Sequence, residues 1–134
     1  MTFLDKNMKN DSSSRAAYAA AAADAVGHYA AYHDAIYTHQ PATEGDGYTE
    51  QQLRVDFPKE AGITGANLTK FQQLYDQRAT KTFVDKVDAN ATAAGINSTP
   101  TFKVIKGDKT VTLDLSSATP NEDGVMAAIT DALK

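Results

Sequence analysis

The sequence predicts an α+β protein with five helices, then a β-hairpin, then a last helix. Three observations lead to this prediction. Apolar residues recur at helical spacings of three and four over most of the first 95 positions. They alternate every second residue between Phe102 and Leu115, as in a strand with one covered face. A helix-capping pattern then returns at Thr119.

The first two helices are predicted from the residues at their ends and from their apolar spacing. Asp11 and the serines that follow it provide N-cap chemistry for an alanine-rich helix that continues to about Val26. Gly27 is a typical residue to end it. A second helix is expected from His28 to His39, followed by a loop rich in glycine and proline.

Three more helices are expected before position 95. Thr49 and Gln52 form a capping-box pattern, so the third helix should begin near Glu50 and break or kink at Pro58. The fourth should follow a cap at Thr64 or Asn67 and end near Gln77. The fifth should span 81–94, with its apolar side facing inward: Phe83, Val87, Ala91 and Ala94.

The pattern changes after Ile96. A strand from Thr101 to Lys106 and a return strand are joined by Gly107 and Asp108, and glycine in the first turn position favours a type II′ turn. The last helix should be capped by Thr119, with Pro120 at its first position.

Composition excludes several functions. The 134 residues contain no cysteine, which excludes thiol chemistry, disulfides and zinc sites built on thiolates. A net charge of −4 argues against binding to nucleic acid. The alanine run from Ala19 to Ala23 is far too short to span a bilayer, and no signal-peptide pattern opens the chain. The localisation of this chain therefore stays open.

Neither a catalytic residue nor a metal site is predicted, and no cofactor is expected. His28, His33 and His39 lie five and six positions apart, which places them on different sides of a helix. The acids on the predicted helices, among them Asp34 and Asp85, are expected on solvated faces. No phosphate-binding loop or nucleophile motif occurs in the sequence.

The segment Ser98-Thr99-Pro100 joins the last of the five helices to the first strand. Proline is tolerated at a strand start, and an X-Pro bond there can be cis. Because only about 5–6% of such bonds are cis in folded proteins, the residues alone favour an ordinary trans proline.

Three stretches carry a family resemblance. The run from Gly95 to Phe102 resembles the cis-proline loop of the DsbA-like group of thioredoxin-fold disulfide oxidoreductases and isomerases. The stretch from Ser14 to Tyr37 is similar to that family's helical segment, and Gln40 to Thr49 resembles a loop of actinobacterial, hence bacterial, members. Together the resemblance covers roughly residues 2–134.

The resemblance implies a partial thioredoxin-like fold with a DsbA-type helical insertion. Residues 1–11 would be a strand remnant or loop, 12–95 the inserted helical domain, and 96–134 the cis-proline loop, hairpin and last helix. The N-terminal half that carries a Cys-x-x-Cys pair in the family is expected to be missing. By resemblance, Ser98, Thr99 and Pro100 would contact substrate peptides.

Two hypotheses of function follow. The chain is the C-terminal portion of a DsbA-like thiol:disulfide oxidoreductase, inactive in disulfide exchange, with unfolded or cysteine-containing proteins as partners. Alternatively, it is a non-catalytic peptide-binding or protein-binding thioredoxin-like module. An unrelated small helical interaction protein is a third reading. The family usually acts outside the cytoplasm, where disulfides persist. An open hairpin edge would also allow two copies to associate.

Overall fold

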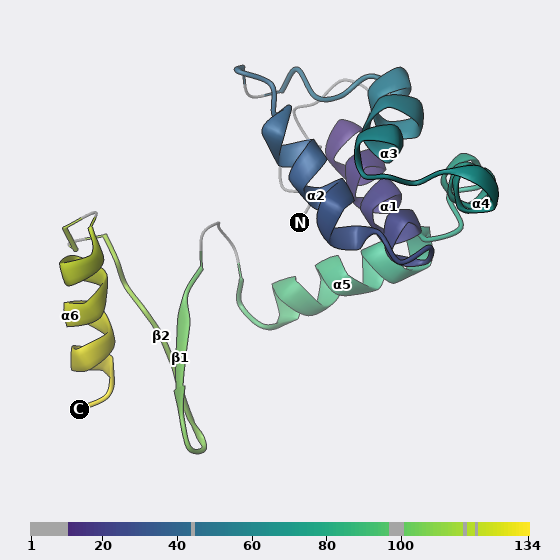
Figure 1. The fold of residues 1–134 in the computed structure, drawn as a ribbon. Helices are drawn as coiled ribbons and strands as arrows, with labels where there is room; N and C mark the ends of the chain where they lie inside the picture. Colours follow the sequence, from purple (N-terminus) through teal and green to yellow (C-terminus); the bar gives the residue numbers. More distant parts are fainter. Residues whose placement is uncertain (1–10, 44, 97–100, 117, 120) are drawn as a thin grey trace. The chain divides into compact units, whose positions relative to one another are not determined.

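The computed structural model describes residues 11–43, 45–96, 101–116, 118–119 and 121–134. The chain divides into two compact units, Met1–Ala93 and Ala94–Lys134, which we call the helical unit and the hairpin unit. The sequence pattern predicts five helices, a hairpin and a last helix, and the described elements follow that order (Figure 1).

All the regular secondary structure in the described part of the helical unit is helical. They are α1 (Ser12–Asp24), α2 (Tyr29–Thr38), the π-helical turn η1 (Gln52–Asp56), α3 (Phe57–Glu60), α4 (Gly65–Asp76) and α5 (Lys81–Ala93). The alanines of α1 allow its backbone to approach its neighbours closely, and Ala19, Ala22 and Ala23 are completely buried. They pack in one hydrophobic core with the largest buried side chains, which are Tyr32, Leu53, Phe57, Ile63 and Phe71.

The third helix begins as predicted, but at Pro58 the structure differs from the predicted break. The amide of Thr49 donates to Gln52 Oε1 at 2.9 Å, and the amide of Gln52 donates to Thr49 Oγ1 at 3.2 Å, which confirms the capping box. The helix does not break at Pro58. It widens instead into the π-helical turn, in which the Phe57 amide donates to the carbonyl of Gln52 five residues before it.

The widened turn compensates for the missing N–H of Pro58. Proline can donate to neither the Leu53 carbonyl, five residues before it, nor the Arg54 carbonyl, four before it. Side chains from other helices donate instead: Tyr32 Oη to Leu53 O at 2.7 Å, and Gln72 Nε2 to Arg54 O at 3.3 Å. The helix therefore continues through Pro58 with both carbonyls satisfied.

The prediction of an inward face on α5 was wrong. No residue of α5 is buried, Phe83 is 63% exposed and Val87 is 47% exposed. The apolar spacing produced an amphipathic helix, but the core of the helical unit is filled by the earlier helices. The apolar side of α5 therefore faces solvent within its own unit.

The hairpin unit contains β1 (Lys103–Lys106), β2 (Lys109–Thr112) and α6 (Glu122–Ala132). The strands pair antiparallel, with Lys106 opposite Lys109, so the loop has the two residues that the sequence predicts. Gly107 has a φ of 58°, which suits the first position of a type II′ turn.

Helix α6 begins two residues later than predicted. The cap is Asn121, whose Oδ1 accepts a hydrogen bond from the Gly124 amide at 2.9 Å, and not Thr119. Thr119 has another role: its carbonyl oxygen lies 2.2 Å from where a Cβ on Gly124 would stand. Only glycine fits there. No described residue of the hairpin unit is buried.

Candidate functional site

The predicted peptide-binding residues, Ser98, Thr99 and Pro100, lie outside the described residues. The structure does describe the chain on both sides of them. Lys103 Nζ donates to the carbonyl of Ala94 at 3.1 Å, which ties the start of β1 to the segment before the loop. The Leu113 amide donates to Phe102 O at 2.9 Å, so strand pairing begins two residues after Pro100.

Strand β1 presents a free edge within the described part of the hairpin unit. Because Leu113 bonds to Phe102, the alternation of an antiparallel ladder turns the main-chain groups of Lys103 and Ile105 away from β2. The described sheet has only these two strands. Apolar side chains are also uncovered here: Ile105 is 72% exposed and Phe102 is 46% exposed. This strand can therefore accept another extended segment.

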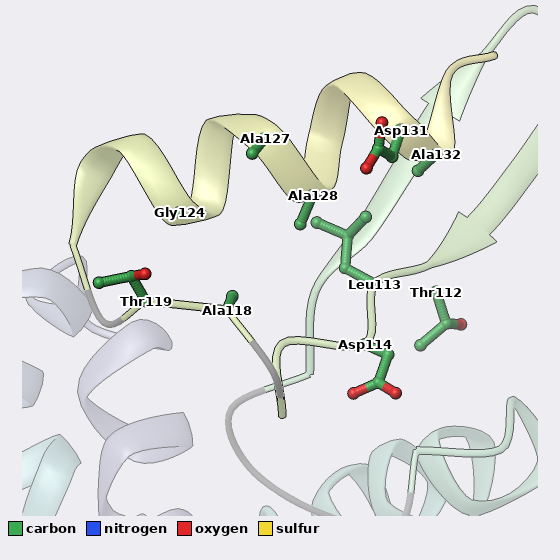
Figure 2. Close-up of a pocket in the computed structure, with 10 residues that line it drawn as sticks. All are labelled: Thr112, Leu113, Asp114, Ala118, Thr119, Gly124, Ala127, Ala128, Asp131 and Ala132. Carbon is green, nitrogen blue, oxygen red and sulfur yellow. The ribbon is translucent and has the colours of Figure 1, made fainter.

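A cavity of about 420 Å³ lies between the end of β2 and α6 (Figure 2). Small residues of α6 form one wall, and Figure 2 shows Leu113 and Ala128 pointing toward one another. The lining is Thr112, Leu113, Asp114, Ala118, Thr119, Gly124, Ala127, Ala128, Asp131 and Ala132. Its polar groups are hydroxyls and carboxylates.

The carboxylates of this cavity already have partners. Asp131 pairs with Lys134, and Asp114 accepts a hydrogen bond from the Ser116 amide at 2.9 Å. Hydrogen bonds from the Ser116 side chain and backbone lower the pKa of Asp114. An acid with a lowered pKa is a poor proton donor at neutral pH, so Asp114 is not suited to act as a general acid.

The three histidines lie apart and have separate partners. His28 Nδ1 lies 3.0 Å from the carbonyl of Ala61, the residue that follows α3, so this histidine has a protein contact and is not simply solvated. The His33 ring lies against the Tyr37 ring at a tilt, with the centroids 4.5 Å apart. His39 Nε2 lies 2.8 Å from Glu60 Oε2. Within the described ranges, no three histidine or acidic side chains are grouped in a way that could hold a metal ion.

A second cavity, of about 240 Å³, lies in the helical unit and was not predicted. It is lined by Arg15, Tyr18, Glu50, Tyr75, Asp76 and Arg78. Arg15 forms an ion pair with Glu50 and donates to the carbonyl of Tyr48 at 3.1 Å. Tyr75 Oη donates to Glu50 Oε2 at 3.1 Å. We call these six lining residues the arginine pocket.

Burial and neighbouring charges both shift pKa values in the arginine pocket. Burial, followed by the negative charge and hydrogen bond of Glu50, raises the pKa of Tyr75 to about 12. On the adjoining wall, Arg54 holds Asp76 with two hydrogen bonds, of 2.7 and 2.9 Å. These bonds lower the pKa of the Asp76 carboxyl. Asp76 is therefore ionised and paired with Arg54 at neutral pH, and Glu50 is paired with Arg15.

Comparison with models of known families identifies the family to which the chain belongs. A family model described as thioredoxin matches residues 1–122, which is most of the chain. The chain belongs to the thioredoxin family. No curated protein and no solved structure matched it. This thioredoxin-family chain has no cysteine among its 134 residues.

The match includes the predicted peptide-binding segment and both strands of the hairpin, and it ends at the first residue of α6. In this thioredoxin-family chain, no helix in the described ranges is long and apolar enough to cross a membrane.

Proposed function

We propose that the chain is the peptide-binding portion of a DsbA-like thiol:disulfide oxidoreductase and is itself inactive in disulfide exchange. The observation that carries this proposal is the thioredoxin match over residues 1–122 in a chain without cysteine. Exchange proceeds through attack by a thiolate, and this polypeptide has none. The chain would therefore contribute substrate contacts, and the redox pair would belong to a separate segment.

The arrangement of the elements supports this division of roles. In the proposal, residues 12–95 form a DsbA-type helical insertion and 96–134 the end of the thioredoxin-like domain, with 1–11 as a strand remnant or loop. Ser98, Thr99 and Pro100 then stand at the entry to β1, in a cis-proline loop. The free main-chain groups of Lys103 and Ile105 lie next to them in sequence, where an extended peptide or a further strand can pair.

An insulin-reduction assay tests the inactivity. With dithiothreitol as reductant, we expect the turbidity of reduced insulin to develop at the rate seen without the chain. The control is any thioredoxin with a Cys-x-x-Cys pair, which accelerates the reaction. A rate that rises in proportion to the concentration of this chain would contradict the proposal.

Peptide binding is tested by NMR on the full chain. We expect an unfolded, reduced peptide to shift the amide signals of Thr99, Thr101 and Phe102. Pro100→Ala should weaken this binding several-fold, whereas Pro41→Ala, a matched change in the loop after α2, should leave it unchanged. No shift with any unfolded peptide, or equal weakening by both variants, would remove the assignment of Ser98–Pro100.

The alternative is a non-catalytic peptide-binding module, and the lack of any cysteine in the chain favours it. Reading the coding DNA upstream of codon 1 separates the two functions. An in-frame Cys-x-x-Cys supports the oxidoreductase. Without such a pair, the chain would be a binding module, and the same peptide titration would define its site.

The free edge of β1 also supports a proposal that two copies associate through their hairpins. Light scattering during gel filtration should then give a mass that rises with concentration toward that of a dimer. Ile105→Glu should abolish this rise, because it places a charge on the pairing edge. A constant monomer mass at all concentrations would contradict self-association.

A further inference from the structure

The arginine pocket includes Arg78, a cation that none of the described acids of the helical unit neutralises. Arg15 is paired with Glu50, and Arg54, which borders the pocket, is paired with Asp76. Lys81, close by in sequence, pairs with Asp85. Within the described ranges, Arg78 makes no ion pair, and its guanidinium lies over the ring of Tyr18 at 6.0 Å.

The backbone holds Arg78 in an unusual conformation at the end of α4. Its φ is 48°, in the left-handed region that glycine normally occupies. Two hydrogen bonds close the turn: the Arg78 amide donates to Tyr75 O and the Ala79 amide to Leu74 O, both at 2.9 Å. These are the two bonds of a Schellman helix end, and they fix the backbone from which the Arg78 side chain extends.

Tyr18 provides a fixed surface for the guanidinium. Its side chain is buried, and its carbonyl accepts a hydrogen bond from Thr80 Oγ1 at 2.9 Å. A guanidinium held over an aromatic ring by cation–π attraction still has N–H donors that can bind another group. Those donors match the two oxygens of an oxyanion in a bidentate arrangement.

We propose that Arg78, on the rim of the arginine pocket, binds a carboxylate group. The carboxylates Glu50 and Asp76 in the pocket walls repel a phosphate dianion more strongly than they repel a carboxylate. The pocket therefore favours a ligand with a single negative charge. The carbonyls at the end of α4 also oppose an anion, so the affinity is modest, with a Kd on the order of millimolar. The ligand is therefore the carboxylate of a small acid or of an acidic peptide.

NMR on the full chain tests the site at constant ionic strength, with acetate and inorganic phosphate as probes at pH 8, where the phosphate is mainly a dianion. We expect saturable shifts of the Arg78 Nε–H signal and of the Tyr18 ring protons with acetate, and a Kd at least several-fold weaker with phosphate. An acidic tripeptide with a blocked C-terminus distinguishes a peptide side chain from a free acid: tighter binding than acetate assigns the site to peptides, and weaker binding to small acids.

Two variants and a control complete the test. Arg78→Gln should weaken acetate binding at least tenfold. Arg78→Gly should do the same while it relieves the left-handed backbone, so loss of binding there does not reflect misfolding. Lys86→Gln removes one exposed positive charge on α5 and should leave the Kd unchanged. Shifts that do not saturate, or equal weakening by Lys86→Gln, would overturn the proposal.

Discussion

The two units of the chain use the same kinds of local structure but differ in what they bury. In the helical unit, five large apolar or aromatic side chains and the alanines of α1 form one core. In the hairpin unit, the described helix is capped and the turn has its favoured glycine, yet none of the described side chains is buried. Caps and hydrogen bonds are therefore present in both units, whereas only the helical unit has a core of fully buried side chains among the described residues.

A similar contrast in burial is found within the helical unit itself. The core ends with Tyr75 in α4, and α5 adds nothing to it. Most of the large exposed apolar side chains among the described residues follow Tyr75, the last core residue, in sequence. Phe83, Phe102 and Ile105 are examples. A two-stranded hairpin is marginal in water without further strands or a packed helix face. Of the four predictions that follow, the first two test this contrast between the units, and the last two measure single interactions that stabilise the helical unit.

Hydrogen exchange should show the contrast most strongly. We expect core amides of α1 and α4 to be protected on the order of 10³-fold or more, because they exchange only when a domain with ~5 kcal/mol of stability unfolds. Amides of β1 and β2 should exchange within about tenfold of an unstructured peptide. Mass spectrometry of proteolytic fragments measures both. Equal protection in the two units would show that the hairpin unit is stabilised by contacts of its own.

A pair of matched phenylalanine substitutions should separate the units by stability. Phe71→Ala empties a fully buried position between Tyr32 and Tyr75, and we expect a loss of about 3–5 kcal/mol in the free energy of unfolding. Phe102→Ala removes the same side chain from a half-exposed position, with an expected loss below about 1 kcal/mol. Urea denaturation followed by circular dichroism measures both. Similar losses would contradict the comparison.

Removal of a single hydroxyl should have an intermediate effect in the core. Tyr32→Phe leaves the Leu53 carbonyl without its donor, and we expect a loss of about 1–3 kcal/mol. Burial raises the pKa of Tyr32 far above its value in the unfolded chain, about 10. The stability tied to this group is therefore complete below pH 10 and is lost at higher pH. Denaturation at pH 8 to 11 should show a shallower alkaline decline in Tyr32→Phe than in the wild type.

The smallest effect is expected at the pair between Arg54 and Asp76. The hydrogen bonds of Arg54 lower the pKa of Asp76 below its value in the unfolded chain, about 3.9. Its contribution is therefore complete above that unfolded pKa and disappears as pH falls through the lower folded value. Asp76→Asn should be slightly less stable than the wild type at pH 7, and the difference should shrink toward pH 2. A difference that is constant with pH would point to packing instead of charge.

The predictable features of this chain are those that depend on neighbouring residues. The Thr49–Gln52 cap and the turn at Gly107 involve groups within three positions of each other, and both were predicted correctly. The cap of α6 was placed two residues early, because Thr119 and Asn121 are both good capping residues. The cap from Asn121 Oδ1 to the Gly124 amide defines the later start, and the close approach of Thr119 to Gly124 accompanies it.

Long-range pairings could not be predicted. The arginine pocket depends on contacts such as that between Arg15 and Glu50, 35 positions apart, and no local pattern marks them. The exposed face of α5 follows from how completely the earlier helices fill the core, which spacing alone does not reveal. The assignment of Ser98, Thr99 and Pro100 to peptide binding stays a prediction.

The turn before Pro58 has one further consequence. A π-helical turn contains one more residue than the α-helical turn it replaces, so it acts as a one-residue offset within the helix. The residues on its two sides are rotated by about 100° relative to an uninterrupted α-helix. Glu50 can thereby reach Arg15 while Phe57 enters the core. Deleting one residue between them would preserve a helix but would align only one of these two contacts at a time.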